Sequence, residues 1–216
     1  MVQLPAYDDD FGERCMKRVS YAIALGIVAC ALSHPAQAQV DTRTSQVQSG
    51  EYSVESGHTQ IVFSLSHFGF TTYTGILPNI TGHLTLNAQD PKQSSVSVTI
   101  PMGDIQTTNS SLNDELKEAP WFNVAKYPNA TFQSTSIIQT DPSHAVLYGN
   151  LTLHGVTRPE MLKVHFISSG INMFDKKYTV GFEASGTIQR SDFGVKMFVP
   201  YIGDEVQLRI AGAFEK

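Results

Sequence analysis

Six histidines follow residue 38 and are the side chains best suited to metal binding or acid–base chemistry. They are His58, His67, His83, His144, His154 and His165. Neutral imidazole is a common metal ligand. However, no two of these histidines show the H-x-H or H-E-x-x-H spacing that would place two ligands together, and both cysteines precede residue 38. The sequence therefore predicts no metal site.

Hydrolytic chemistry would need a nucleophile, a base and a group that orients the base. Ser191 and Asp192 could join a histidine for this purpose, but the G-x-S-x-G turn that exposes a nucleophilic serine does not occur. Residues 190–194 fit a turn at a strand end more simply, with Asp192 accepting hydrogen bonds from nearby backbone and Arg190 paired locally. We therefore expect no catalytic residue, no enzymatic activity and no cofactor.

Apolar side chains are the stronger basis for a function, because they could enclose an apolar ligand. Large aromatic residues are numerous for one small domain and include Phe63, Trp121, Phe132, Phe166, Phe182, Phe193 and Phe198. Each buried methylene of a lipid contributes roughly 0.8 kcal/mol, so a long chain could bind without polar recognition. The alternative is ordinary core packing, and the sequence leaves the division between these roles open.

The elements that must position these side chains alternate between apolar and polar residues with a period of two. This pattern predicts half-buried strands. It is found in residues 60–67, 95–100, 132–138, 147–153, 162–166, 178–188 and 206–214. The connections are short and rich in turn residues, as at Asp90-Pro91, so successive strands should be antiparallel. About eight strands in one domain predict an all-β barrel or sandwich.

One segment breaks the strand pattern and predicts a short helix. Residues 111–119 are rich in helix formers, Ser111 and Asp114 resemble a capping pair, and Pro120 would end the helix. Leu112 and Leu116 are four residues apart and can face the same side. We expect this helix to plug or cover one end of a barrel.

Small residues occupy several positions where a packed core would need bulk. They are Ser134, Ser136, Gly149, Ala184, Gly186 and Gly212. An eight-stranded barrel is just wide enough to be filled by side chains or to hold one small ligand. The small residues favour a cavity, but glycines that relieve strain in bent strands remain an equal alternative.

The first 38 residues have the layout of a secretory signal peptide. A basic start at Met16 is followed by an apolar run over residues 19–32 and by Ala36-Gln37-Ala38. We expect translation from Met16 and cleavage after Ala38, with a lipidated Cys30 as the alternative. Cleavage would leave no cysteine and hence no disulfide, a flexible lead-in over residues 39–50 and a domain over residues 51–216. The net charge of −5 argues against nucleic-acid binding.

Ordered motifs run through the chain from about Tyr52 to Phe214. They are His58-Thr59-x-Ile61-x-Phe63-x-Leu65-x-His67-Phe68-Gly69, Asp104-Ile105-x-Thr107-x-Asn109, Asn113-Asp114-x-x-Leu116, Trp121-Phe122, Tyr127-Pro128, Gly149-x-Leu151-Thr152-Leu153-His154-Gly155-Val156-Thr157, Arg190-Ser191-Asp192-Phe193-Gly194 and Gly203-Asp204-x-Val206. Together they resemble the lipocalin-like YceI family of bacterial periplasmic proteins. Asn113 departs from the arginine usual in that family, which leaves the ligand's head group open.

The resemblance implies an eight-stranded antiparallel barrel with one short α-helix near an open end, located in the periplasm. Some family members look like carriers of a polyisoprenoid or quinone-type chain, so a long-chain lipid is the expected ligand. A homodimer and transient membrane contact are further expectations by analogy. The side chains expected to contact the ligand are Phe63, Leu65, His67, Ile105, Leu112, Leu116, Trp121, Phe122, Phe132, Phe166, Phe182 and Phe193.

Two other functions stay open. One is a stress or redox accessory factor linked to a membrane cytochrome or quinone system. The other is a ligand-free barrel that acts through a protein partner. Fold alone does not decide among these functions.

Overall fold

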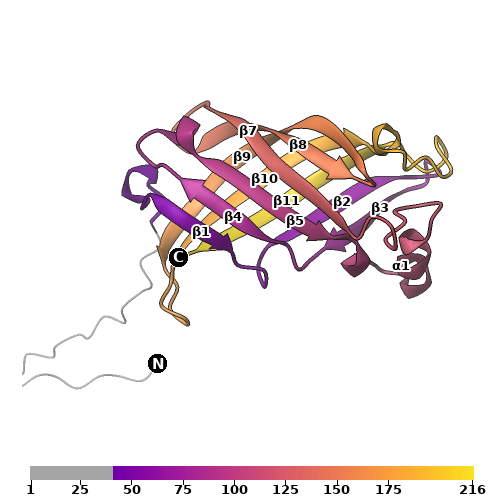
Figure 1. Cartoon of the computed structure of the whole chain (residues 1–216), viewed down its shortest axis with the longest axis horizontal. Coiled ribbons are helices and arrows are strands. Elements are labelled where there is room, and N and C mark those ends of the chain that lie inside the picture. The colour runs from indigo at the N-terminus through magenta and orange to yellow at the C-terminus, as the bar shows by residue number, and fades with distance from the viewer. Residues whose placement is uncertain (1–40) are drawn as a thin grey trace, which may run out of the picture. The chain divides into compact units, whose positions relative to one another are not determined.

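A closed antiparallel sheet dominates the computed structural model, which describes residues 41–216 (Figure 1). The strands are β1 (Gly50–Val54), β2 (Gln60–His67), β3 (Thr71–Leu77), β4 (Thr81–Leu86), β5 (Ser95–Pro101), β6 (Gln106–Thr107), β7 (Asn129–Gln139), β8 (His144–Leu153), β9 (Val156–Ile171), β10 (Tyr178–Gln189) and β11 (Glu205–Glu215). The helices are α1 (Ser110–Lys117) and the 3-10 turns η1 (Thr44–Gln46), η2 (Pro91–Gln93), η3 (Met102–Asp104) and η4 (Arg190–Phe193). The predicted start at Met16, the cleavage site after Ala38 and Cys30 lie outside the described residues.

The chain runs along the barrel wall eight times, and we call each of these runs a pass. The ring runs β1–β4–β5–β7–β8–β9–β10–β11 and closes where β11 pairs with β1. β2 extends the pass of β1 along β11, β3 belongs to the pass of β4, and β6 extends the pass of β5 by pairing with β3. The predicted eight-stranded antiparallel barrel with a short helix is therefore confirmed, with its first three passes interrupted.

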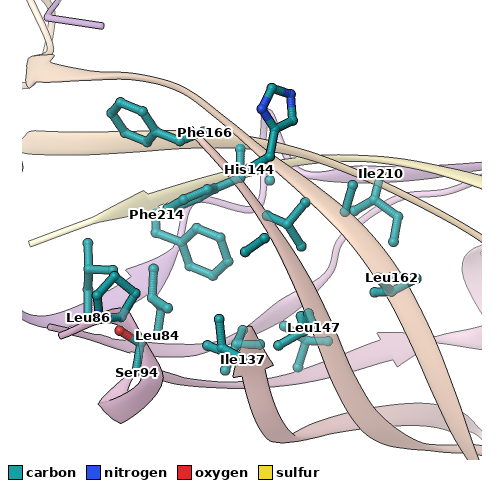
Figure 2. A pocket seen from close by; sticks show the side chains of 18 of the residues that line it. Leu84, Leu86, Ser94, Ile137, His144, Leu147, Leu162, Phe166, Ile210 and Phe214 are labelled. Carbon is teal, nitrogen blue, oxygen red and sulfur yellow. The ribbon is translucent and has the colours of Figure 1, made fainter. Parts of the chain in front are cut away.

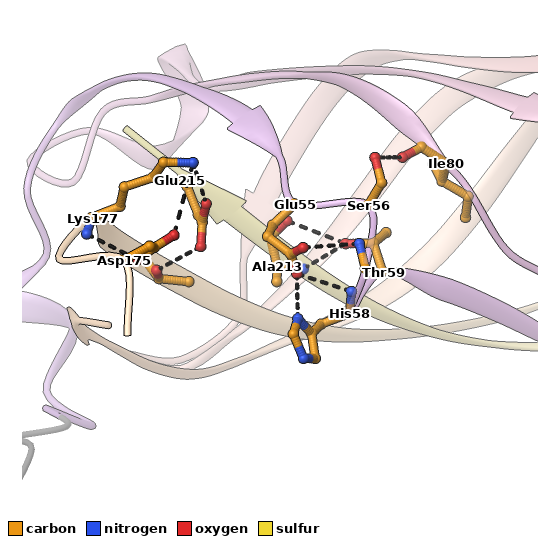
Figure 3. Close-up of polar contacts among 11 residues, drawn as sticks. Glu55, Ser56, His58, Thr59, Ile80, Asp175, Lys177, Ala213 and Glu215 are labelled. Carbon is orange, nitrogen blue, oxygen red and sulfur yellow. Dashed lines mark hydrogen bonds and ion pairs between the residues drawn. The ribbon is translucent and has the colours of Figure 1, made fainter. Parts of the chain in front are cut away.

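The break between β1 and β2 is held by polar contacts (Figure 3). The Glu55 carboxylate accepts hydrogen bonds from the backbone N–H and from Nδ1 of His58, at 2.9 and 2.6 Å. The Thr59 hydroxyl donates to the carbonyl of Ala213 in β11 and accepts from its N–H, at 3.2 and 3.0 Å. These contacts anchor the loop while β1 and β2 both pair with β11.

Residues 41–49, which we call the N-terminal strap, are attached to the barrel. The backbone N–H and carbonyl groups of Asp41 bond to those of Ser169 in β9, both at 2.8 Å. η1 follows, and Val47 is buried against Tyr52 and Phe166. These contacts place the strap against β9 and the core, and the flexibility predicted from its polar composition stays a prediction.

A bulge in β7 changes which side chains face the interior. The pairing of β7 with β8 shifts register between Ser134 and Ser136. One extra residue moves every later side chain to the opposite face. Ile137 therefore points inward, whereas Ile138 is 50% exposed. The two-residue period over residues 132–138 predicts that Ile138 shares a face with Phe132, and the bulge makes this prediction wrong.

The helix α1 closes one end of the barrel, away from the C-terminus (Figure 1). Its N-cap is Asn109, whose side-chain oxygen accepts from the N–H of Ser111 at 3.0 Å. The expected cap at Ser111 and the expected end at Ala119 are both displaced, since the helix ends at Lys117. Within residues 41–216, no helix combines the length and hydrophobicity needed to cross a membrane.

Candidate functional site

An apolar cavity of about 490 Å³ lies inside the barrel next to the N-terminal strap, and we call it the strap cavity. Figure 2 shows that its wall is built by inward side chains of several strands, including Leu84, Leu147, Leu162 and Phe166. Polar side chains such as His144 belong to segments near strand ends. The alternation of the strands thus produces a hydrocarbon-lined space with polar groups toward one end.

A second apolar cavity, of about 360 Å³, lies next to α1, and we call it the helix cavity. Leu112 and Leu116 of α1 form part of its wall together with Trp121. The indole Nε1 of Trp121 donates to Oε1 of Glu115 at 3.0 Å, which satisfies both polar groups. Leu112 and Leu116 therefore present hydrocarbon to the cavity, while the Glu115 carboxylate has a hydrogen-bond donor in Trp121.

Five side chains line both cavities, and we call this ring the waist. They are Ile61, Ile100, Leu151, Ile188 and Leu208, from five passes of the barrel. Shared walls mean that the two cavities adjoin inside the barrel. A long, narrow apolar molecule would have to pass the waist to occupy both.

Nearly all of the side chains predicted to contact a ligand line one of the cavities. Phe63, Leu65, His67, Ile105, Leu112, Leu116, Trp121 and Phe122 line the helix cavity, and Phe132, Phe166 and Phe182 line the strap cavity. Phe193 lines neither: it is fully buried in η4 and packs in the core with Ile188 and Val206. Its role is core packing, because the turn carries its ring behind the cavity wall.

Gly149 leaves room for an aromatic ring inside the barrel. A β-carbon at Gly149 would collide with the ring of Phe132, which lies across the neighbouring strand. This small residue therefore makes room for an aromatic lining residue and does not itself open empty space. The expected alternatives were a cavity and relief of strain in a bent strand, and the contact with Phe132 is a third reason for a glycine at this position.

Most aliphatic lining residues of the strap cavity were not singled out from the sequence. Val96, Leu147, Leu162 and Ile210 are examples. The signal for them was present in the two-residue period of their strands. Phe198 lines the helix cavity from a loop, and no periodicity could have placed it there.

The turn at η4 is stabilised by a buried arginine. The guanidinium of Arg190 donates to the carbonyl oxygens of Gly203, Val195, Met197 and Ile202 at 2.8 to 2.9 Å. Burial lowers its pKa, but a guanidinium stays protonated in proteins. The expected local pairing of Arg190 is confirmed, and its partners are backbone carbonyls.

The carboxylate that bonds to this turn is a different one from the one predicted. Asp204 accepts from the N–H and the hydroxyl of Ser191, at 2.8 and 2.6 Å. Asp192 is exposed. The hydrogen bond from the Ser191 hydroxyl therefore serves the structure of the turn.

The histidines contact neighbouring groups singly or in pairs. Nδ1 of His154 lies 3.1 Å from the carbonyl oxygen of Phe193, and the rings of His144 and His165 stack at 4.3 Å. Among residues 41–216, no three His, Cys, Asp or Glu side chains are grouped so that they could hold a metal ion.

Comparisons with known proteins agree with this architecture. The model of the YceI-like domain matches residues 52–214. A UPF0312 protein of Pseudomonas aeruginosa (strain LESB58) is 32% identical over 168 residues, which cover 77% of this chain and 87% of the relative. Burkholderia cenocepacia BcnA shares the fold with a TM-score of 0.64 at 22% identity, covering 71% of this chain and 95% of BcnA.

A further solved structure is described as a polyisoprenoid binding domain from Saccharophagus degradans implicated in plant cell wall breakdown. It has a TM-score of 0.55 at 14% identity and covers 76% of this chain and 97% of that domain. At this identity the likeness concerns the fold alone. The match over residues 52–214 and the identity with the Pseudomonas relative identify the family, and the chain belongs to the YceI-like proteins.

Proposed function

We propose that this protein binds one long apolar lipid, a polyisoprenoid or quinone-type chain, inside its barrel and carries it as a passive shield from water. The observation that carries the proposal is the pair of adjoining apolar cavities that meet at the waist. Each methylene that leaves water for this lining contributes roughly 0.8 kcal/mol. The polyisoprenoid binding described for the Saccharophagus domain of the same fold supports this class of ligand.

Native mass spectrometry of the protein purified from its own cells, followed by organic extraction, tests the proposal. A bound mass that matches an isoprenoid or another long-chain lipid is expected. A coloured or redox-active extract would instead favour an accessory factor of a quinone or cytochrome system. A bare polypeptide mass, unchanged after incubation with such lipids, would overturn lipid binding and favour a barrel that acts through a protein partner.

We also propose that the protein works after export to the periplasm. The support is the signal-peptide layout that ends at Ala38. The same mass measurement tests this, since an N-terminus at Gln39 is expected. A mass that matches a chain beginning at a diacylated Cys30 would instead indicate a membrane-anchored protein.

Replacing Phe132 by Asp is expected to weaken lipid binding by roughly tenfold or more, because a carboxylate facing the cavity would lose its hydration when lipid binds. Phe132 is buried and lines the strap cavity, whereas Phe68 is 48% exposed at the edge of the helix cavity. Phe68→Asp is therefore the matched variant with a smaller effect. Titration with a fluorescent isoprenoid measures both, after thermal unfolding shows that both variants fold. Equal affinities would contradict this orientation.

The helix cavity opens beside a group of exposed aromatic rings that we call the aromatic rim: Phe68, Phe70, Phe198 and Tyr201. Two turns carry them, and the backbone N–H of Phe68 joins these turns by donating to the carbonyl of Tyr201 at 2.8 Å. Phe68 and Phe198 also line the cavity. Aromatic side chains partition into membrane interfaces, so we propose that this rim touches a membrane while lipid enters or leaves.

Replacing Phe70 by Ser is expected to slow lipid transfer from vesicles by about tenfold, since an aromatic ring that enters the interface contributes about 1.5 kcal/mol or more. Phe70 is 88% exposed and lines neither cavity. Its loss should therefore leave the equilibrium affinity for solubilised lipid unchanged. Phe174→Ser, at an equally exposed ring in another loop, is the control. Equal transfer rates for the two variants would contradict the proposed contact.

A further inference from the structure

Glu160 places a carboxylate on the inner face of β9. Its neighbours of the same parity, Leu162 and Val164, line the strap cavity, and Glu160 lines it as well. It stands opposite Gly149 of β8, so no side chain from that strand covers it. An inward carboxylate in a hydrocarbon-lined barrel needs an explanation, because desolvation of an unpaired polar group is unfavourable.

The barrel wall changes at the same place. The ladder between β9 and β10 ends at the pair Lys163–Ser185, and Glu160 lies beyond that end. An outer groove lies over this region, and Glu160 lines this groove and the strap cavity together with Met161 and Leu208. The carboxylate is therefore located between the apolar interior and water, where the polar end of a bound chain could lie.

The other charged groups of the two cavities already have partners. Glu115 accepts from the indole of Trp121, and Arg190 donates to backbone carbonyls. Within the described part of the chain, no residue forms a hydrogen bond or ion pair with the Glu160 carboxylate, and Glu160 is the only Asp, Glu, Lys or Arg among those lining the strap cavity. Its hydrogen-bonding capacity is therefore free for a ligand.

The surroundings of Glu160 offer its carboxylate no cationic partner on the inner face. Burial, and secondarily the negative charge of Asp192 in η4, raise the pKa of the Glu160 carboxyl. Lys163 and Arg209 line only the outer groove and belong to the exposed face of their strands, so they do not neutralise the inner side. A carboxylate accepts hydrogen bonds, which matches the hydroxyl of an alcohol end.

We propose that Glu160 anchors the end of the bound lipid and selects an uncharged hydroxyl end over a phosphate end. This inference rests on the proposed lipid-binding function and adds its polar specificity. A phosphate placed at this position would meet a carboxylate and the nearby charge of Asp192, and like charges at close range repel. The geometry thus favours a prenol over a prenyl phosphate.

The test compares ligands with one C20 isoprenoid chain and three ends: the hydrocarbon, the alcohol geranylgeraniol and its diphosphate. Wild-type protein is expected to bind the alcohol about tenfold more tightly than the hydrocarbon or the diphosphate, the range of one hydrogen bond to a buried acceptor. Glu160→Leu should bind the alcohol and the hydrocarbon equally. Glu160→Gln keeps a donor and an acceptor without charge, so it should retain the alcohol and bind the diphosphate more tightly than wild type.

Glu183→Gln, at an exposed carboxylate on the outer face of β10, is the control and should match wild type for all three ligands. Equal binding of alcohol and hydrocarbon by wild type, or an unchanged preference in Glu160→Leu, would overturn the anchor while leaving lipid binding intact. No binding of any of the three chains by wild type would instead overturn the proposed function itself.

Discussion

Replacing Leu151 by Trp is expected to reduce the affinity for a long isoprenoid by about 100-fold or more while leaving a short chain able to bind. Leu151 belongs to the waist and lines both cavities. The indole of a tryptophan is larger than the leucine side chain, so it would narrow the waist and confine the ligand to one cavity. Each methylene left in water forfeits roughly 0.8 kcal/mol, so four of them correspond to about 3 kcal/mol and a factor of roughly 100.

The measurement is a series of binding titrations with isoprenoid alcohols from C10 to C40. Wild-type affinity should rise with chain length well past the length at which the Leu151→Trp curve becomes flat. Asn150→Trp is the matched control, because Asn150 is the adjacent residue in β8 and its side chain is exposed. Parallel curves for wild type and Leu151→Trp would show that the chain does not cross the waist, and the two cavities would then not hold one ligand.

The inner lining of the barrel was largely predictable because a strand imposes a strict period. Phe132, Phe166 and Phe182 were expected to face a ligand, and each lines the strap cavity. The period failed at Ile138, where the β7 bulge adds one residue. A bulge depends on the partner strand and on the curvature of the barrel, and neither is encoded in the alternation of a single strand.

Features outside the strands were less predictable, since they depend on contacts between distant segments. Phe193 shares the aromatic character of the lining residues, but η4 turns its ring into the core. The N-terminal strap is polar, yet Asp41 pairs with Ser169 of β9, a contact that the composition of the strap does not indicate. Inside strand β9, by contrast, Glu160 has the same parity as Leu162, but a charged side chain was not expected to line an apolar interior. A polar residue at an apolar parity was therefore the signal that sequence reasoning missed.

The aromatic rim also escaped prediction for a physical reason. Residues 195–203 have no regular period, and the peptide bond between Val199 and Pro200 is cis. Their conformation is organised by hydrogen bonds from the buried guanidinium of Arg190 and by the hydrogen bond that the Gly203 N–H donates to the carbonyl of Ser66 in β2. The mouth of the helix cavity is therefore specified by one arginine more than by local propensity.

Replacing Arg190 by Leu is accordingly expected to lower the free energy of unfolding by about 3–5 kcal/mol, the range for the loss of a buried charged hydrogen-bond network. The side chain is 5% exposed and its guanidinium serves four carbonyl oxygens. Their loss would leave these buried or partly buried oxygens without their donors. Arg190→Lys should lose nearly as much, because an ammonium on one nitrogen cannot reach carbonyls arranged around a planar fork.

Urea unfolding followed by tryptophan fluorescence measures this effect near the site, since Trp121 lies with its ring 5.8 Å from the guanidinium carbon. Arg158→Leu is the control, because Arg158 is exposed on β9 and its loss should change stability by about 0.5 kcal/mol or less. If Arg190→Leu unfolds at the same urea concentration as the control, water must replace the four donors, and the arginine would then not organise the mouth. If it is destabilised as expected, lipid loading through the aromatic rim should fail at a lower temperature than lipid retention, because the loop that forms the mouth would loosen before the barrel strands separate.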